Sequence, residues 1–255
     1  MDNQLSILID KCWDYYVKYR DMQNSPIVNP CIPVFWFGDL NKYQNESSKK
    51  VITLAINPSN DEFRLKKTDN YNFIRFKKGQ DIYTKDKLNI VDKNVFIRTL
   101  NNYFKDEPYS WFYRMETPLN CINSSYGEVI QSGKYSNYAI HTDLCPLSTF
   151  NKWGKLSENI QNQLLIDFKN ILNDFIDYLN PDIILSSLSE NNLDKYFNIN
   201  AKKDCIKNIE NDNGGFIRKY KYNDIYLING RNMRGTPFGA MTYDFIKNSL
   251  DRMEA

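Results

Sequence analysis

The sequence predicts an α/β fold in which three layers (α/β/α) are built on a central, mainly parallel sheet of four to five strands. Short β-prone apolar segments alternate with segments whose apolar residues recur at helical spacing. This alternation is typical of parallel strands joined by helices. Because α/β domains of this size often fold around one core, we expect a single domain over residues 1–255.

The predicted elements follow in order along the chain. Apolar residues at three- and four-residue spacing predict helices over 5–19, 93–104, about 157–180 and about 240–252. Buried β-prone runs predict strands over 34–38, 51–56, 138–144, 182–186 and 225–228. The polar residues 41–50 predict a turn or short loop, and 108–128 an aromatic, turn-rich stretch. The irregular segment 60–90 predicts a functional loop rather than a linker.

Composition excludes several classes of protein. Hydrophobic residues make up 42% of the chain, so we expect it to be globular throughout. It has no apolar run of the roughly 20 residues that cross a bilayer, and no signal-peptide pattern, so we expect a cytoplasmic protein without a membrane partner. The five cysteines are scattered and His141 is the sole histidine. We therefore expect reduced thiols and no metal. We also expect a monomer without a cofactor.

One segment has an uneven charge, although the net charge is only +2. Between Arg64 and Lys78 there are six basic residues and one acidic residue, with aromatic residues interleaved. Basic side chains neutralise phosphates and aromatic rings stack on bases, so we expect Arg64, Lys66 and Lys67 to contact DNA. The alternative is a solvated loop with a few buried aromatic residues.

Three polar motifs directly follow predicted strands. They are Asn57-Pro58-Ser59-Asn60, Asp143-Leu144-Cys145-Pro146-Leu147 and Asn229-Gly230-Arg231-Asn232-Met233-Arg234-Gly235. Ligands of open parallel sheets bind beyond the carboxyl ends of the strands, so one fold can bring these motifs together. Each motif alone is an ordinary turn sequence.

The first two motifs resemble those of the uracil-DNA glycosylase superfamily, particularly its single-strand-selective and mismatch-specific branches. Ala55-Ile56-Asn57-Pro58-Ser59 resembles the first motif, and Asp143-Leu144-Cys145-Pro146-Leu147 is similar to the segment that reads the pyrimidine edge. The resemblance extends in topology over roughly residues 34–250. It implies a uracil-DNA glycosylase-like fold in which Asn57 positions the attacking water, and in which Ile56, Pro58 and Ser59 bind substrate.

The third motif departs from the family, whose last motif usually supplies a histidine to the leaving base. Arg231, Asn232 or Arg234 could instead supply a hydrogen bond or positive potential. We take Arg234 as catalytic, Asn232 as substrate-binding and Arg231 as DNA-binding. The alternative is that this loop only grips phosphate.

Two further groups of candidates follow the first motif. Asp61 or Glu62 could supply the carboxylate that stabilises positive charge or accepts the proton of the water, and we take Asp61 as that catalytic carboxylate. The alternative is that both are surface acids. Tyr71 and Phe73 are candidates for stacking on an extruded base, with a core role as the alternative.

Asp143 stands where uracil-specific members of the family carry Asn. An ionised Asp offers only acceptors, which suit the N4 amino group of cytosine. The alternative is that Asp143 caps a backbone turn. Since excision of unmodified cytosine would be ruinous for a host, we expect the target to be 5-hydroxymethylcytosine or its glucosylated form in bacteriophage DNA. This implies a monofunctional DNA glycosylase that leaves an abasic site and acts in anti-phage defence.

Other functions remain open. Within the same family, the chain could be a uracil or mismatch repair glycosylase. Outside it, the chain could be a catalytically inactive DNA-binding module of the same fold, a glycosylase with a Schiff-base lysine, or a nuclease.

Overall fold

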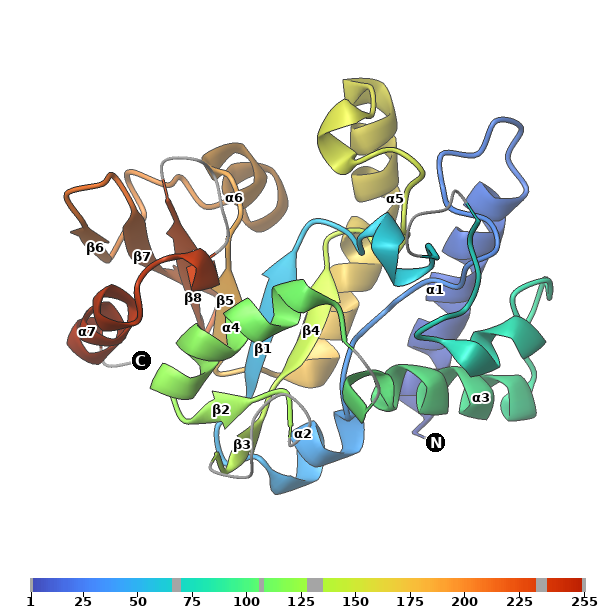
Figure 1. Ribbon diagram of the computed structural model, residues 1–255, viewed down its shortest axis with the longest axis horizontal. Coiled ribbons are helices and arrows are strands. Elements are labelled where there is room, and N and C mark those ends of the chain that lie inside the picture. Colours follow the sequence, from blue (N-terminus) through green and yellow to red (C-terminus); the bar gives the residue numbers. More distant parts are fainter. Residues whose placement is uncertain (1, 66–69, 106–107, 128–134, 233–237, 254–255) are drawn as a thin grey trace. The chain divides into compact units, whose positions relative to one another are not determined.

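The computed structural model describes residues 2–65, 70–105, 108–127, 135–232 and 238–253 (Figure 1). The chain divides into two compact units that interleave along the sequence. Unit 1 contains Met1–Gly38, Ile56–Pro108 and Thr142–Leu179. Unit 2 contains Asp39–Ala55, Tyr109–His141 and Asn180–Ala255.

A six-stranded sheet with the order β4-β1-β5-β8-β7-β6 is built largely from unit 2. Its strands are β1 (Val51–Ala55), β4 (Ile140–Asp143), β5 (Ile183–Ser186), β6 (Lys207–Glu210), β7 (Phe216–Tyr222) and β8 (Ile225–Arg231). β5 pairs in parallel with β1 and β8, whereas β7 is antiparallel to β8 and β6. The predicted α/β class with a mainly parallel sheet is confirmed, but the sheet has six strands rather than four to five.

The two strands that sequence reasoning missed have one solvated face. In β6 only Ile209 is buried, and β7 alternates buried residues with charged ones such as Arg218. Antiparallel strands commonly have one solvated face, whereas the predicted strands were recognised because they are apolar on both faces. A separate two-stranded sheet pairs β2 (Ser124–Ser125) with β3 (Asn137–Tyr138).

The helices of unit 2 correct two predictions. They are α2 (Leu40–Glu46), α4 (Ser110–Cys121), α6 (Glu190–Phe197) and α7 (Tyr243–Met253), with the short 3-10 helix η5 (Phe238–Ala240). The expected turn over 41–50 is mostly α2, because Asp39 caps its first turn by accepting from the backbone N–H groups of Asn41 and Lys42. The turn-rich stretch over 108–128 contains α4, which tolerates Pro118 inside the helix.

Unit 1 contains the long helices α1 (Asn3–Arg20), α3 (Ile90–Asn101) and α5 (Glu158–Leu179). Tyr15 of α1 packs on Phe168 of α5, with ring centroids 5.0 Å apart. Four short 3-10 helices accompany them: η1 (Asn60–Glu62), η2 (Lys77–Asp81), η3 (Tyr103–Lys105) and η4 (Trp153–Lys155). Two of these, η1 and η2, lie in the otherwise irregular segment 60–90.

The strand expected over 34–38 is wrong, because these residues lie outside both sheets. Val34, Phe35 and Trp36 are nevertheless fully buried. Phe35 packs on Phe175 of α5, with ring centroids 4.1 Å apart. Aromatic packing against this helix, rather than strand pairing, accounts for the apolar run.

Candidate functional site

The loops that follow β1 and β4 are hydrogen-bonded to each other within unit 1. We call this contact, between residues 56–60 and 145–150, the loop clasp. Its bonds run from Cys145 N to Ile56 O (2.9 Å), from Asn57 Nδ2 to Leu147 O (3.2 Å), from Ser148 Oγ to Ser59 O (3.1 Å) and from Asn60 Nδ2 to Phe150 O (3.0 Å). The structure therefore brings the first two of the three polar motifs together.

Asn57 is half-buried in the clasp. Its amide nitrogen also lies 3.1 Å from Pro58 O and 3.4 Å from Thr149 Oγ1. The donors of the amide are thus directed at protein oxygens, and Oδ1 is its acceptor. An acceptor on a side chain held in this way can orient a water molecule. The same bonds also give Asn57 a structural role, because they join two loops.

The other residues predicted around the base contribute to this loop mainly through their backbones. Pro58 is buried, and Ile56 and Ser59 are half-buried. The Ser59 hydroxyl accepts from Asp61 N at 3.2 Å and so caps η1. The structure therefore gives Ile56 and Ser59 a part in positioning Asn57 and Glu62.

Glu62, at the end of η1, is 1% exposed. Its Oε2 accepts a hydrogen bond from Tyr103 Oη at 2.9 Å and lies 3.6 Å from Arg75 Nη1. Burial raises the pKa of Glu62 to about 7, although Arg75 and Tyr103 oppose that rise. Asp61, by contrast, is exposed, and its carbonyl accepts from Arg75. Of the two carboxyl groups, Glu62 has the burial that tunes a group for proton transfer.

Asp143 ends β4 and is 1% exposed. It belongs to unit 1, and its negative charge is among the causes that raise the pKa of Glu62. Two residues further on, Cys145 N enters the loop clasp. The predicted base-reading carboxyl therefore lies in the interior, within electrostatic range of Glu62.

His141 lies in unit 2 and is 2% exposed. Its Nδ1 is 2.8 Å from Thr53 Oγ1, which in turn is 2.5 Å from Tyr126 Oη. The rings of Trp111 and Phe112 enclose it, with centroids 5.0 and 5.2 Å away. These contacts give the sole histidine a role in the core of unit 2.

The third motif begins inside β8 rather than after it, in unit 2. Asn229 is fully buried and bonds twice to Leu188: its Oδ1 accepts from Leu188 N (2.7 Å) and its Nδ2 donates to Leu188 O (3.0 Å). A Cβ on Gly230 would lie 2.5 Å from the Phe238 ring, so the Asn-Gly pair serves close packing and not a turn. Sequence reasoning missed this role because Asn-Gly ordinarily indicates a turn.

The remaining residues of the third motif are described only in part. Arg231 and Asn232 are half-buried. Among the described residues, no hydrogen-bond partner accepts from the buried Nε of Arg231. Arg234, the predicted catalytic cation, lies outside the described residues. Arg231 therefore offers a buried donor that a ligand could use.

The aromatic and basic candidates of segment 64–78 differ in exposure. Tyr71 is half-buried; its backbone bridges Arg64, and its ring lies 5.3 Å from that of Phe150. Phe73 is 6% exposed and packs on Tyr83 at 5.2 Å, which makes it mainly a core residue. Lys66 and Lys67 lie outside the described residues. Phe150, which is 43% exposed, was missed because it follows the second motif without any pattern of its own.

Two other properties concern the described ranges only. Within them, no group of three or more His, Cys, Asp or Glu residues could hold a metal ion. None of the helices there has the length and apolar character needed to cross a membrane.

No protein-family model matches the chain, and no curated protein matches it either. The proposals below therefore depend on the geometry of the site and on the sequence motifs.

The buried carboxyl of Glu62 should make the protein less stable as the pH rises. Its pKa is raised from 4.5 to about 7, so between these values the folded state holds a proton that the unfolded state releases. The stabilisation is complete below about pH 4.5 and is lost as the pH rises through about 7. Its size is on the order of 3 kcal/mol in the free energy of unfolding. Urea titrations across this range should give a flatter profile for Glu62→Gln than for the wild type.

Glu116 of α4 provides the matched control, since burial also raises its pKa to about 7. Glu116→Gln should remove its own share of the pH dependence and leave that of Glu62. An unchanged profile in Glu62→Gln would show that Glu62 is ionised throughout.

Proposed function

We propose that this protein is a DNA glycosylase of the uracil-DNA glycosylase type, with a three-layer α/β/α fold, that excises a modified cytosine from bacteriophage DNA. The observation that carries the proposal is the loop clasp, which joins Asn57 to the loop after Asp143. Glu62, in the same unit, supplies a carboxyl that titrates near neutral pH. The reaction needs these groups: an acceptor that orients water, a base, and a reader of the target.

Asn57 would hold the attacking water through Oδ1. In the proposed step the oxygen of water bonds to C1′ of the nucleotide, and the bond from C1′ to the base breaks. Its electron pair leaves with the base, which then takes up a proton. Because the sugar gains oxocarbenium character before the water is fully bonded, positioning contributes more than the basicity of the amide.

Glu62, rather than Asp61, would take the proton released by the water. A general base works best when its pKa lies near the working pH. The hydroxyl of Tyr103 and the guanidinium of Arg75 hold one oxygen of Glu62 in place. Asp61 is exposed, and its backbone carbonyl accepts a hydrogen bond from Arg75. Asp61 therefore helps to fix the position of the guanidinium that lies next to Glu62.

Asp143 would select the base. Its buried carboxylate offers acceptors to an exocyclic amino group, which cytosine carries and uracil lacks. A group added to the base would then separate phage cytosine from host cytosine. Arg231, with a buried Nε that no described residue uses, supports a contact to DNA from the third motif.

One observation favours a DNA-binding module without activity as the second candidate. The side-chain donors of Asn57 are used within the clasp, and this structural role alone accounts for an Asn at that position. The two candidates differ in whether base is released.

The two asparagines of the clasp separate these candidates. Asn57→Ala should lower the release of free base from modified phage DNA by about a hundredfold or more, because the attacking water loses its acceptor. Asn60→Ala removes another clasp bond from the same loop and should change the rate by only a few-fold. Mass spectrometry of the released bases measures both rates. Equal rates in wild type and Asn57→Ala would exclude the enzymatic proposal.

The pH dependence of base release tests Glu62. The single-turnover rate should rise with pH and level off above about 7, because only the ionised carboxylate accepts a proton. Glu62→Gln should be slow and independent of pH over the same range. Asp61→Asn should keep the pH dependence of the wild-type rate. If Asp61→Asn rather than Glu62→Gln loses this pH dependence, Asp61 is the base, as the sequence suggested.

Asp143→Asn tests base selection on duplexes that carry uracil, cytosine, 5-hydroxymethylcytosine or its glucoside. The wild type should act on modified cytosine, and the variant should gain activity on uracil by roughly tenfold or more, since Asn both donates and accepts. Wild-type cleavage of uracil without cleavage of modified cytosine would contradict this assignment.

A further inference from the structure

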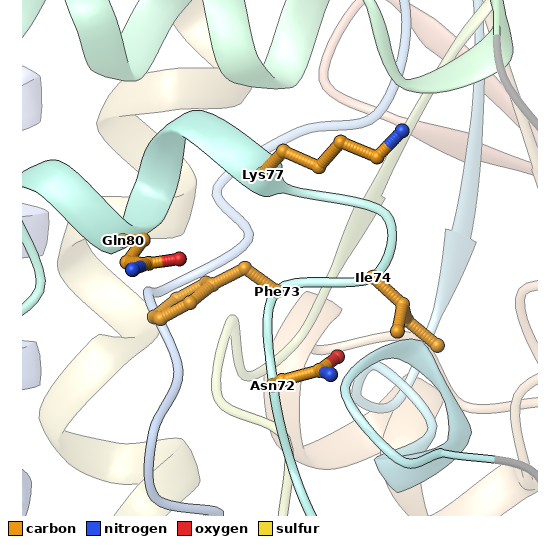
Figure 2. Close-up of a pocket in the computed structure, with 5 residues that line it drawn as sticks. All are labelled: Asn72, Phe73, Ile74, Lys77 and Gln80. Atoms are coloured by element: carbon orange, nitrogen blue, oxygen red, sulfur yellow. The ribbon is translucent and has the colours of Figure 1, made fainter.

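A pocket of about 360 Å³ lies in the segment 72–80 of unit 1. It is lined by Asn72, Phe73, Ile74, Lys77 and Gln80. Figure 2 shows the first three on an irregular stretch and the other two on η2. Its volume is at the lower end of the range for small-molecule sites. One of its lining residues, Phe73, is also a sequence-based candidate for base stacking, whereas Asn57, Glu62 and Asp143 do not line the pocket.

Asn72 gives the pocket an acceptor that lacks a donor. Its Oδ1 is buried and has no hydrogen-bond partner among the described residues. Its backbone is fixed, because Asn72 N donates to Phe63 O at 2.7 Å. A buried amide oxygen without a donor costs free energy, and a ligand with an N–H or O–H group would remove that cost.

The apolar wall of the pocket is rigid. Phe73 packs against Tyr83 and Phe63, with ring centroids 5.2 and 6.1 Å away. Gly79 of η2 lies so close behind it that an added Cβ would be 3.2 Å from Phe73 Cδ1. Phe73 and Ile74 supply the apolar part of the lining, and Figure 2 shows them on opposite sides of the backbone.

The charge at the pocket is positive. Lys77 and Gln80 are exposed, and none of the lining residues is acidic. Arg75, in the same segment, is instead directed to Glu62 and the carbonyl of Asp61. Lys78, which is also exposed, does not line the pocket. An anion is therefore favoured at one end of a site whose other end offers an acceptor.

We propose that this pocket binds one nucleotide of the DNA strand, with its phosphate at Lys77 and its base against the apolar part of the lining. Asn72 Oδ1 then accepts from an exocyclic amino group, so adenine or cytosine is preferred over thymine. That the nucleotide belongs to a DNA strand rests on the proposed function. The nucleotide chemistry itself rests only on the residues that line the pocket.

Mononucleotide binding to the full chain tests the proposal, with dAMP, dCMP, dTMP and inorganic phosphate as probes in calorimetric titrations. The wild type should bind dAMP and dCMP more tightly than dTMP, and inorganic phosphate most weakly. Lys77→Gln should weaken dCMP binding about tenfold, whereas Lys78→Gln, its adjacent exposed control, should change it less than twofold. Asn72→Leu should abolish the preference for dCMP over dTMP.

Equal effects of the two lysine variants, or equal affinities for dCMP and phosphate, would overturn the pocket as a nucleotide site. A short unmodified single-stranded oligonucleotide should displace dCMP. The affinity of the protein for this oligonucleotide should depend less on salt in Lys77→Gln than in the wild type, by an amount that corresponds to about one phosphate contact. If the protein binds dCMP and the oligonucleotide at the same time, the nucleotide in the pocket does not come from the DNA strand. Nucleotide binding without any release of base would contradict the proposed function alone. Release of base with no mononucleotide binding would contradict the pocket alone.

Discussion

The loop clasp is the contact on which the arrangement of the candidate site depends. Two loops that are far apart in sequence, 56–60 and 145–150, must each satisfy backbone groups that no strand or helix uses. Side chains satisfy several of them: Asn57 donates to Leu147 O, Ser148 to Ser59 O and Asn60 to Phe150 O. Each bond contributes about 1 kcal/mol, so their joint effect is a fixed geometry more than a large stabilisation. That fixed geometry is what a water-orienting amide requires.

The clasp also explains how a fully buried carboxyl follows directly after a half-buried loop. Ser59 takes part in the clasp through its carbonyl and caps η1 through its hydroxyl, and η1 directs Glu62 inward and Asp61 outward. Glu62 then depends on Arg75 and Tyr103, because a buried carboxylate without partners would cost several kcal/mol. Burial also raises the pKa of Glu116 in unit 2, and no cation contributes to this shift. Its carboxyl accepts hydrogen bonds from the backbone N–H of Tyr126 and the hydroxyl of Ser125 instead. Of these two carboxyl groups, Glu62 is the one that directly follows the loop clasp.

Sequence patterns predicted the parts of this structure that are decided locally. The apolar runs of β1 and β5, and the helical spacing of α1 and α5, are sufficient because burial on both faces or on one helical stripe leaves a direct trace in the sequence. The meeting of the first two motifs also followed from their positions after strands. The sequence did not show that Glu62 is buried and Asp61 exposed. Two adjacent acidic residues look alike in the sequence, and only the turn of η1 gives them different environments. Asn229 was misread for a similar reason, since its pairing with Leu188 depends on a neighbouring strand.

The absence of a histidine from the third motif limits the chemistry that the site can perform on its base. His141 is held between Thr53, Trp111 and Phe112 in unit 2. Cytosine leaves a sugar less readily than uracil, because the anion formed at its ring nitrogen is less stabilised, so its departure needs a donor or a positive potential. Arg231 of unit 2 carries a guanidinium, which is a permanent cation, and its buried Nε has no acceptor among the described residues. A permanent cation cannot deliver a proton, so in the proposed reaction a base that finds no other donor leaves as an anion that water later protonates.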